Sequence, residues 1–171
     1  MVTNLSIQNY ALIDKLDVGF SPGLSIITGE TGAGKSILVG ALSLLLGERA
    51  DTSTLQDKSR KCIVEGAFDI SGYDFKDIFK NADLDYENPA IIRREINAQG
   101  KSRAFINDTP VALVILREFG TRLVDIHSQH EKLLLHNPGF HLEVVDAYAL
   151  HKPLLSHYRK KYDLLKAEEN I

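Results

Sequence analysis

Residues 29–36 constrain this chain more than any other stretch, because they fill every fixed position of the pattern G-x-x-x-x-G-K-[ST]. Glycines at three of these positions allow successive backbone N–H groups to line one concavity and bind an anion. Lys35 would reach the β- and γ-phosphates of ATP, and the Ser36 hydroxyl would bind Mg²⁺. The residues predicted to bind this nucleotide are Gly29, Glu30, Thr31, Gly32, Ala33, Gly34, Lys35, Ser36 and Ile37.

The flanks of this loop have the pattern that a phosphate-binding loop requires. Residues 24–28 form a short β-rich run, so we expect a strand to precede the loop. Residues 37–46 have few polar side chains and predict a buried helix that stops at Gly47. The positive end of that helix would favour a phosphate. The alternative is an ordinary glycine-rich turn before a core helix.

Composition sets the broad class of the protein. A chain of 171 residues with 44% hydrophobic residues can bury a core and suggests one domain with an appendage. A net charge of −3 and a pI near 6.1 show no global basic character, so any contact with nucleic acid needs a local patch or another part. The single cysteine, Cys62, excludes an internal disulfide and a thiolate zinc site, and it predicts a small buried side chain in a reducing cytoplasm. No stretch predicts a membrane span or an export signal.

Alternating apolar residues predict a small antiparallel sheet beside the loop. The stretches expected to be strands are 2–7, 12–20, 61–70, 90–96 and 102–107. Asn9 and Tyr10 would form the first turn, and residues 97–100 would close a hairpin.

Capping residues predict the helices that follow. We expect a helix over 71–81 capped by Ser71, and a second that begins with Thr109 as N-cap and ends at Gly120. Residues 122–127 suggest a short buried strand, and residues 138–149 a helix.

The chain changes character near residue 150. Leu155, Tyr158, Tyr162 and Leu165 alternate spacings of three and four, which fits a coiled coil or an ordinary amphipathic helix. The pattern is uninterrupted at Ile171, so we expect this helix to continue in a longer protein. The predicted organisation is a domain over 1–150 followed by a helical segment over 151–171.

Four stretches, taken in order, resemble the RecN family of bacterial DNA double-strand break repair ATPases, which are SMC-like, ABC-type ATPases. They are 9–13, 29–37, 46–51 and 125–131. The resemblance implies an α/β fold, namely the N-terminal lobe of a P-loop ABC-type ATPase head, with an antiparallel β-subdomain and the start of a coiled-coil helix. It also implies that Gln129 belongs to the Q-loop and contacts Mg²⁺. The implied partners are the C-terminal half of the same head, a second head and DNA. The two heads would form a homodimer that sandwiches ATP. The implied location is the cytoplasm, in association with the nucleoid.

Several motifs of those ATPases are absent from this sequence. It has no Ser-Gly-Gly signature, no Asp-Glu pair after an apolar strand and no switch histidine beyond it. The arginine common near residues 55–57 is also missing, and Arg49 or Arg60 are possible substitutes. We therefore expect ATP hydrolysis to depend on residues outside this chain.

Two other functions stay open at this point. Asp125 could be a metal-binding aspartate at the end of a strand, which would make the chain a self-contained P-loop kinase or nucleotidase. The chain could instead be a non-catalytic dimerisation module with a vestigial loop.

Two further groups of side chains have open roles. The histidines His127, His130, His136 and His141 suggest either a metal site or ordinary surface and loop residues. Arg93, Arg94, Lys101 and Arg103 place several cations on one predicted hairpin, where they could contact phosphates of DNA or nucleotide, or protect a solvated strand edge.

Overall fold

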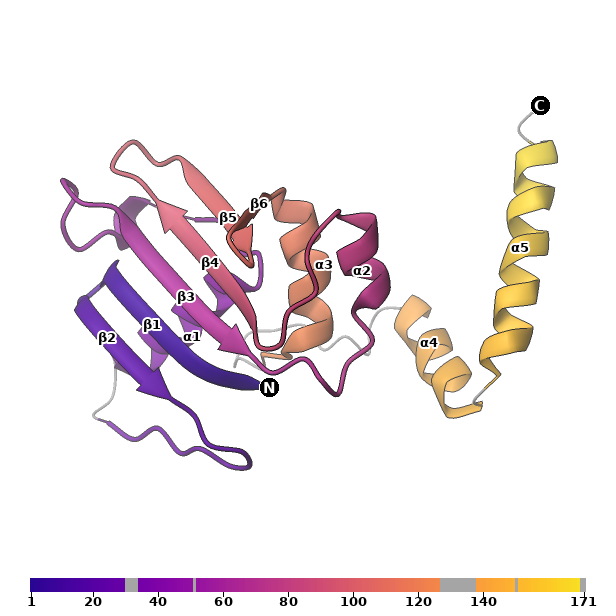
Figure 1. Ribbon diagram of the computed structural model, residues 1–171, viewed down its shortest axis with the longest axis horizontal. Coiled ribbons are helices and arrows are strands. Elements are labelled where there is room, and N and C mark those ends of the chain that lie inside the picture. Colours follow the sequence, from indigo (N-terminus) through magenta and orange to yellow (C-terminus); the bar gives the residue numbers. More distant parts are fainter. Residues whose placement is uncertain (30–33, 51, 127–137, 150, 170–171) are drawn as a thin grey trace. The chain divides into compact units, whose positions relative to one another are not determined.

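The structure is a computed structural model that describes residues 1–29, 34–50, 52–126, 138–149 and 151–169 (Figure 1). The chain divides into two compact units, residues 1–126 and residues 127–171. The first unit holds a sheet with its helices, and the described part of the second is helical. The domain boundary expected near residue 150 stays a prediction.

The first unit is built on a six-stranded sheet in which every neighbouring pair is antiparallel. Its strand order is β2-β1-β3-β4-β5-β6, as Figure 1 shows. The strands are β1 (Val2–Tyr10), β2 (Ile13–Gly19), β3 (Cys62–Phe68), β4 (Ala90–Ile96), β5 (Ser102–Ile106) and β6 (Thr109–Val111). Five of these confirm the predicted strands, although the first turn lies at residues 11–12 and not at Asn9 and Tyr10.

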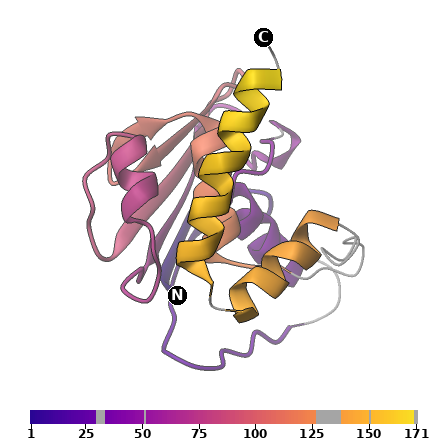
Figure 2. The same ribbon diagram turned by 90° about the vertical axis from the view of Figure 1, so that its right-hand side faces the viewer.

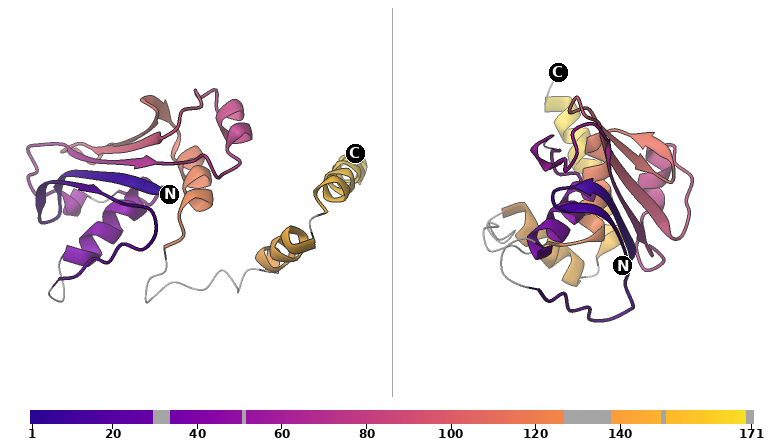
Figure 3. Two further views of the ribbon diagram at one scale, coloured as in Figure 1. Left: turned by 60° about the horizontal axis from the view of Figure 1, so that its bottom comes forward. Right: turned by 90° about the vertical axis from the view of Figure 1, so that its left-hand side faces the viewer.

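One face of the sheet carries the hydrophobic core, because alternate residues of each strand point to the same side. Ile7 lies opposite Val64 in the register of β1 and β3, and Ile92 lies opposite Ile106 between β4 and β5; all four are fully buried. Helices α1 (Gly34–Leu45) and α3 (Leu113–Leu123) lie on one side of the sheet, as the left view of Figure 3 shows. Burying each such aliphatic side chain contributes about 1.5–3 kcal/mol.

Helix α1 ends as predicted, whereas the predicted end of α3 is wrong. Gly47 has a φ of 97°, the left-handed conformation that commonly terminates a helix. Gly120 is buried inside α3, where an added Cβ would lie 2.8 Å from the Cα and carbonyl oxygen of Leu46. This glycine therefore serves close packing between α3 and the end of α1.

The helix start predicted at Thr109 is also wrong. Thr109 and Pro110 lie in β6, and α3 begins at Leu113 after Ala112, which makes no side-chain capping bond. Asn107 and Asp108 have φ values of 47° and 62°, as a tight hairpin turn requires. Proline is tolerated in β6 because this strand lies at the edge of the sheet.

The short helix α2 (Lys76–Asn81) begins later than expected and is not capped by Ser71. The backbone N–H of Ser71 instead donates to a carboxylate oxygen of Asp69 over 3.0 Å. Helix α2 is held by aromatic packing: the ring of Phe75 stacks on Phe119 at 4.3 Å, and Phe79 meets Phe119 edge-on at 5.5 Å. Tertiary contacts of α3 therefore replace the local cap.

Two predicted strands are not formed. Residues 24–28 pair with no strand in the part of the chain that the structure describes, and Leu24 and Ile26 are 87% and 76% exposed. The edges of the sheet are β2 and β6, and neither takes this segment as a neighbour. The second of these strands was predicted over residues 122–127. Residues 122–123 instead form the end of α3, and the N–H of Val124 donates to the carbonyl of Gly120 over 3.1 Å.

The second unit contributes α4 (Pro138–Ala149), which confirms the predicted helix, and α5 (Lys152–Glu169). Figure 2 shows α5 as one uninterrupted helix. Tyr158 and Tyr162 stack along it at 6.1 Å and are 61% and 46% exposed. The coiled coil stays a prediction. Across the described residues, no helix has both the length and the apolar character needed to cross a membrane.

Cys62 is expected to resist thiol reagents while the chain is folded. Its side chain has no exposed surface, and burial raises the pKa of its thiol to about 11. At pH 8 only roughly one thiol in a thousand would then be the reactive thiolate. Ellman's reagent should react slowly with the native chain and within minutes after unfolding in guanidinium chloride. Equal rates in both conditions would contradict this environment.

Candidate nucleotide-binding site

The predicted phosphate-binding loop meets a helix N-terminus in the structure. Helix α1 begins at Gly34, so Lys35 and Ser36 lie in its first turn, and both are exposed. The Lys35 ammonium donates a hydrogen bond of 2.6 Å to the carbonyl oxygen of Gly29, which brings the two ends of the loop together. The first turn of α1 contains no acidic residue, so no carboxylate of that turn opposes an anion at its positive end.

Of the other residues predicted to bind the nucleotide, the structure describes only some. Ile37 is half-buried and packs against the core, which anchors the first turn of α1. Glu30, Thr31, Gly32 and Ala33 lie outside the described residues, as does the Q-loop candidate Gln129. The structure thus brings together Gly29, Gly34, Lys35 and Ser36, and the role of every predicted site residue stays a prediction.

A cavity of about 230 Å³ lies between α1 and the end of β1. Its lining residues are Tyr10, Gly40, Ser43, Leu44, Glu48, Arg49 and Thr54. The ring of Tyr10 packs closely over Gly40, and an added Cβ would lie 2.9 Å from its hydroxyl, so the tyrosine side chain would have to shift.

Arg49 and Arg60 were the possible substitutes for the arginine missing near residues 55–57, and they lie in different surroundings. Arg49 lines the cavity beside α1. Arg60 is engaged by Asp14 at 2.7 Å and Asp57 at 3.0 Å, and these carboxylates raise its pKa. Of the two, Arg49 is therefore the one placed beside α1 in a cavity.

The cations of the β4–β5 hairpin do not form a single basic surface. Adjacent strand residues point to opposite faces, so Arg93 and Arg94 are separated by the sheet. Arg93 pairs with Asp108 at 2.9 Å, lies within 3.6 Å of Glu65, and stacks over the ring of Phe105 at 4.7 Å. These contacts favour a structural role for Arg93 over a phosphate contact.

Arg94 is the residue whose position the sequence did not predict. Its side chain is only 1% exposed and faces the core side of the sheet, beside a cavity of about 320 Å³. The signal for its burial was the alternation of β4, in which Ala90, Ile92 and Ile96 are buried. Arg94 occupies the remaining inward position of that pattern.

The alternative metal-binding residues gain no support from their positions. Asp125 follows α3 in a segment that is not a strand, so the strand end expected for a metal-binding aspartate is not formed. His141 is exposed on α4, and His127, His130 and His136 lie outside the described residues. The described residues contain no group of three or more metal-ligating side chains.

An antiparallel sheet with α1 and α3 on one side is also the fold of the head domains of SMC ATPases. The fold agrees with a chain from a study of ATP-driven dimerization and DNA-stimulated activation of SMC ATPases, with a TM-score of 0.59 at 18% identity over 85% of this chain and 97% of that chain. The SMC head domain from Thermotoga maritima gives a TM-score of 0.51 at 20% identity, covering 69% of this chain and 41% of that chain. The fold is thus the α/β head fold expected from the sequence.

Sequence comparison gives the family. The AAA domain family model matches residues 4–170. The DNA repair protein RecN of Haemophilus influenzae is 38% identical over 99% of this chain, and that of Bacillus subtilis is 40% identical over 87%. The chain belongs to the AAA domain family and is similar in sequence to RecN proteins. It spans 31% and 26% of the lengths of these two relatives.

Proposed function

We propose that this chain is the ATP- and Mg²⁺-binding N-terminal part of an SMC-like ATPase head that acts in DNA double-strand break repair. The observation that carries the nucleotide site is the hydrogen bond between the Lys35 ammonium and the Gly29 carbonyl at the start of α1. It holds a cation at the mouth of a glycine-rich loop, where the helix N-terminus also favours an anion.

The residues fit Mg·ATP by their chemistry. Lys35 would bind the β- and γ-phosphates, Ser36 would contribute its hydroxyl to Mg²⁺, and the backbone N–H groups of residues 29–37 would hold the phosphate chain. Gln129 would add a second contact to the metal. The bound Mg²⁺ supplies charge neutralisation at the phosphates.

Hydrolysis would need a carboxylate base from outside this chain, because an Asp-Glu pair after an apolar strand is absent from the sequence. The exposed side chains of Leu24, Ile26 and Ile27 support a second half that packs beside the loop. We propose that this half is the C-terminal part of the same head, and that two such heads dimerise around ATP. DNA is the proposed partner of the complete protein, in the cytoplasm.

The chain is expected to bind Mg·ATP but to hydrolyse it very slowly. Loss of a general base alone lowers rates by about 10²- to 10⁴-fold. Isothermal titration would measure binding with Mg²⁺ and with EDTA, and phosphate release would measure turnover. Turnover equal to that of a complete head would contradict the proposal. If Asp125→Asn then abolished that turnover, the chain would be a self-contained nucleotidase. Absence of Mg·ATP binding would indicate a vestigial loop.

A further inference from the structure

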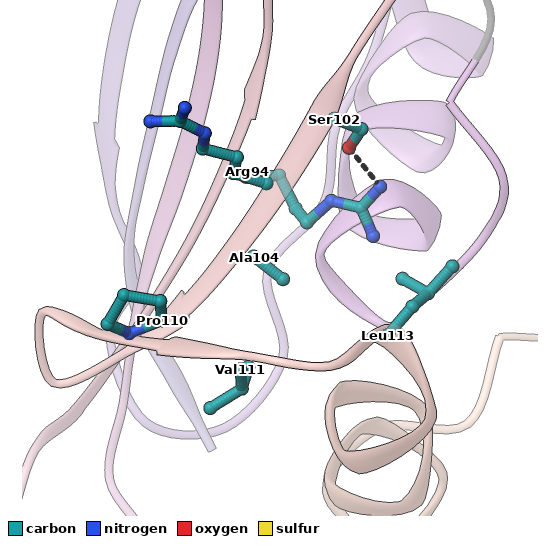
Figure 4. Close-up of a pocket in the computed structure, with 7 residues that line it drawn as sticks. Arg94, Ser102, Ala104, Pro110, Val111 and Leu113 are labelled. Atoms are coloured by element: carbon teal, nitrogen blue, oxygen red, sulfur yellow. Dashed lines mark hydrogen bonds between the residues drawn. The ribbon is translucent and has the colours of Figure 1, made fainter.

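The cavity beside Arg94 is formed by β4, β5, β6 and the first residue of α3 (Figure 4). Its volume is about 320 Å³, in the range of small-ligand pockets. Most of its wall is aliphatic or small, and the polar groups are at one side. The lining residues are Arg94, Ser102, Arg103, Ala104, Pro110, Val111 and Leu113.

Arg94 is buried without enough hydrogen-bond partners. Its Nη2 donates to the hydroxyl oxygen of Ser102 over 2.6 Å, but within the described residues Nε and Nη1 have no partner. Arg94 also forms no ion pair with any described residue. Leaving a buried charged donor unpaired is costly, so such a group in a native protein requires an explanation. Burial lowers the pKa of Arg94, as expected for a desolvated cation.

Among the described residues, the neighbouring strands of the sheet offer no hydrogen-bond acceptor to Nε and Nη1 of Arg94. Its neighbours across the two adjacent strands are Val64 on β3 and Ala104 on β5, which offer no acceptor side chain. Figure 4 shows the guanidinium turned toward Ser102 and Leu113, where β5 and α3 border the cavity. The strands beside Arg94 supply no acceptor for these donors, so the cavity is where water or a ligand can supply one.

The donors that remain define the chemistry of such a ligand. Nε and Nη1 of Arg94 each have an N–H to give, and Ser102 accepts from Arg94, so its own O–H can donate. A guanidinium binds oxyanions strongly. A carboxylate matches the single buried positive charge, whereas a phosphate dianion would bring a second charge between aliphatic walls.

We propose that the Arg94 pocket binds a carboxylate carried on a short aliphatic stem. The carboxylate lies against Arg94 and Ser102, and the stem lies against Ala104, Val111 and Leu113. Arg103 contributes to the wall of the cavity, but it lies opposite Glu95 in the register of β4 and β5, so its side chain projects from the other face of the sheet. Arg94 therefore supplies the positive charge of the pocket. The site is separate from the loop of residues 29–36 and does not depend on nucleotide binding.

Propionate is the probe, because it is the group shared by a free short-chain acid and a glutamate side chain. In ¹H–¹⁵N spectra of the arginine Nε–H groups of the full chain, propionate should shift the Arg94 signal saturably. Sodium chloride of equal ionic strength and inorganic phosphate should not. The signal of Arg122, an exposed arginine paired with Glu118, is the internal control.

Two variants of the pocket separate a loss of ligand binding from a loss of folding. Arg94→Met removes the cation and should abolish saturable binding, as reported by the backbone amides of β5. Ser102→Ala keeps the cation and should weaken binding about tenfold, the effect of one charge-assisted hydrogen bond. The pocket is not a carboxylate site if propionate leaves Arg94 unshifted, if phosphate binds as well as propionate, or if Arg94→Met binds normally.

A capped Ala-Glu-Ala peptide distinguishes the source of the carboxylate. Binding of both the peptide and propionate supports an acidic side chain of a protein segment. Binding of propionate alone supports a free short-chain acid. The Ala-Gln-Ala peptide is the matched control and should not bind.

Discussion

Mg·ATP is expected to bind the Lys35→Ala variant about 10- to 100-fold more weakly than the unchanged chain, because one hydrogen-bonded charge contributes about 1.5–3 kcal/mol. Lys35 lies exposed in the first turn of α1, with its ammonium 2.6 Å from the Gly29 carbonyl. When nucleotide binds, that ammonium would exchange the carbonyl for phosphate oxygens. Isothermal titration of both proteins with Mg·ATP would measure the difference.

Lys76→Ala is the matched control, since Lys76 is also an exposed lysine in the first turn of a helix. It should bind Mg·ATP normally. Thermal melts should show little change for either variant, because exposed substitutions usually alter stability by less than about 0.5 kcal/mol. Equal affinity of Lys35→Ala and the unchanged chain would remove the basis for the proposed nucleotide site.

Gly120→Ala is expected to lower the free energy of unfolding by about 1–3 kcal/mol, the usual cost of overpacking. The new Cβ would lie 2.8 Å from both the Cα and the carbonyl oxygen of Leu46, and backbone atoms cannot move aside as a flexible side chain could. In an exposed helix the same substitution would instead stabilise the protein by about 1 kcal/mol. Urea unfolding followed by circular dichroism would give the sign and the size.

Gly72→Ala is the control for this effect, because a Cβ at Gly72 would meet nothing within 4 Å. It should leave the urea midpoint almost unchanged. A Gly120→Ala variant as stable as the unchanged chain would mean that α3 and the end of α1 do not pack as closely as described. A normal Mg·ATP affinity in a destabilised Gly120→Ala variant would separate this packing from the nucleotide site.

Much of the fold could be predicted because its signals are local. Alternation of apolar residues located β1, β3, β4 and β5, and residues 97–100 correctly predicted the turn between β4 and β5. The helix after the phosphate-binding loop and its stop at Gly47 were also predicted. Each of these depends on the side-chain period or the backbone preference of a few consecutive residues.

The errors arose where distant segments outweigh a local signal. Thr109 and Pro110 have the sequence of a helix start, but Asn107 and Asp108 turn the chain back onto β5 and make them an edge strand. Gly120 has the sequence of a helix stop, but it allows the backbone of Leu46 to approach.

The two candidate sites differ in the same way. The loop of residues 29–36 is recognisable in the sequence, because consecutive residues supply the glycines, the lysine and the hydroxyl that phosphate binding requires. The Arg94 pocket is not, because β4, β5, β6 and α3 each supply part of its wall. Whether an arginine beside a second arginine faces solvent or core depends on strand register and on the helices that cover one face of the sheet. Those are set by contacts between segments far apart in the chain.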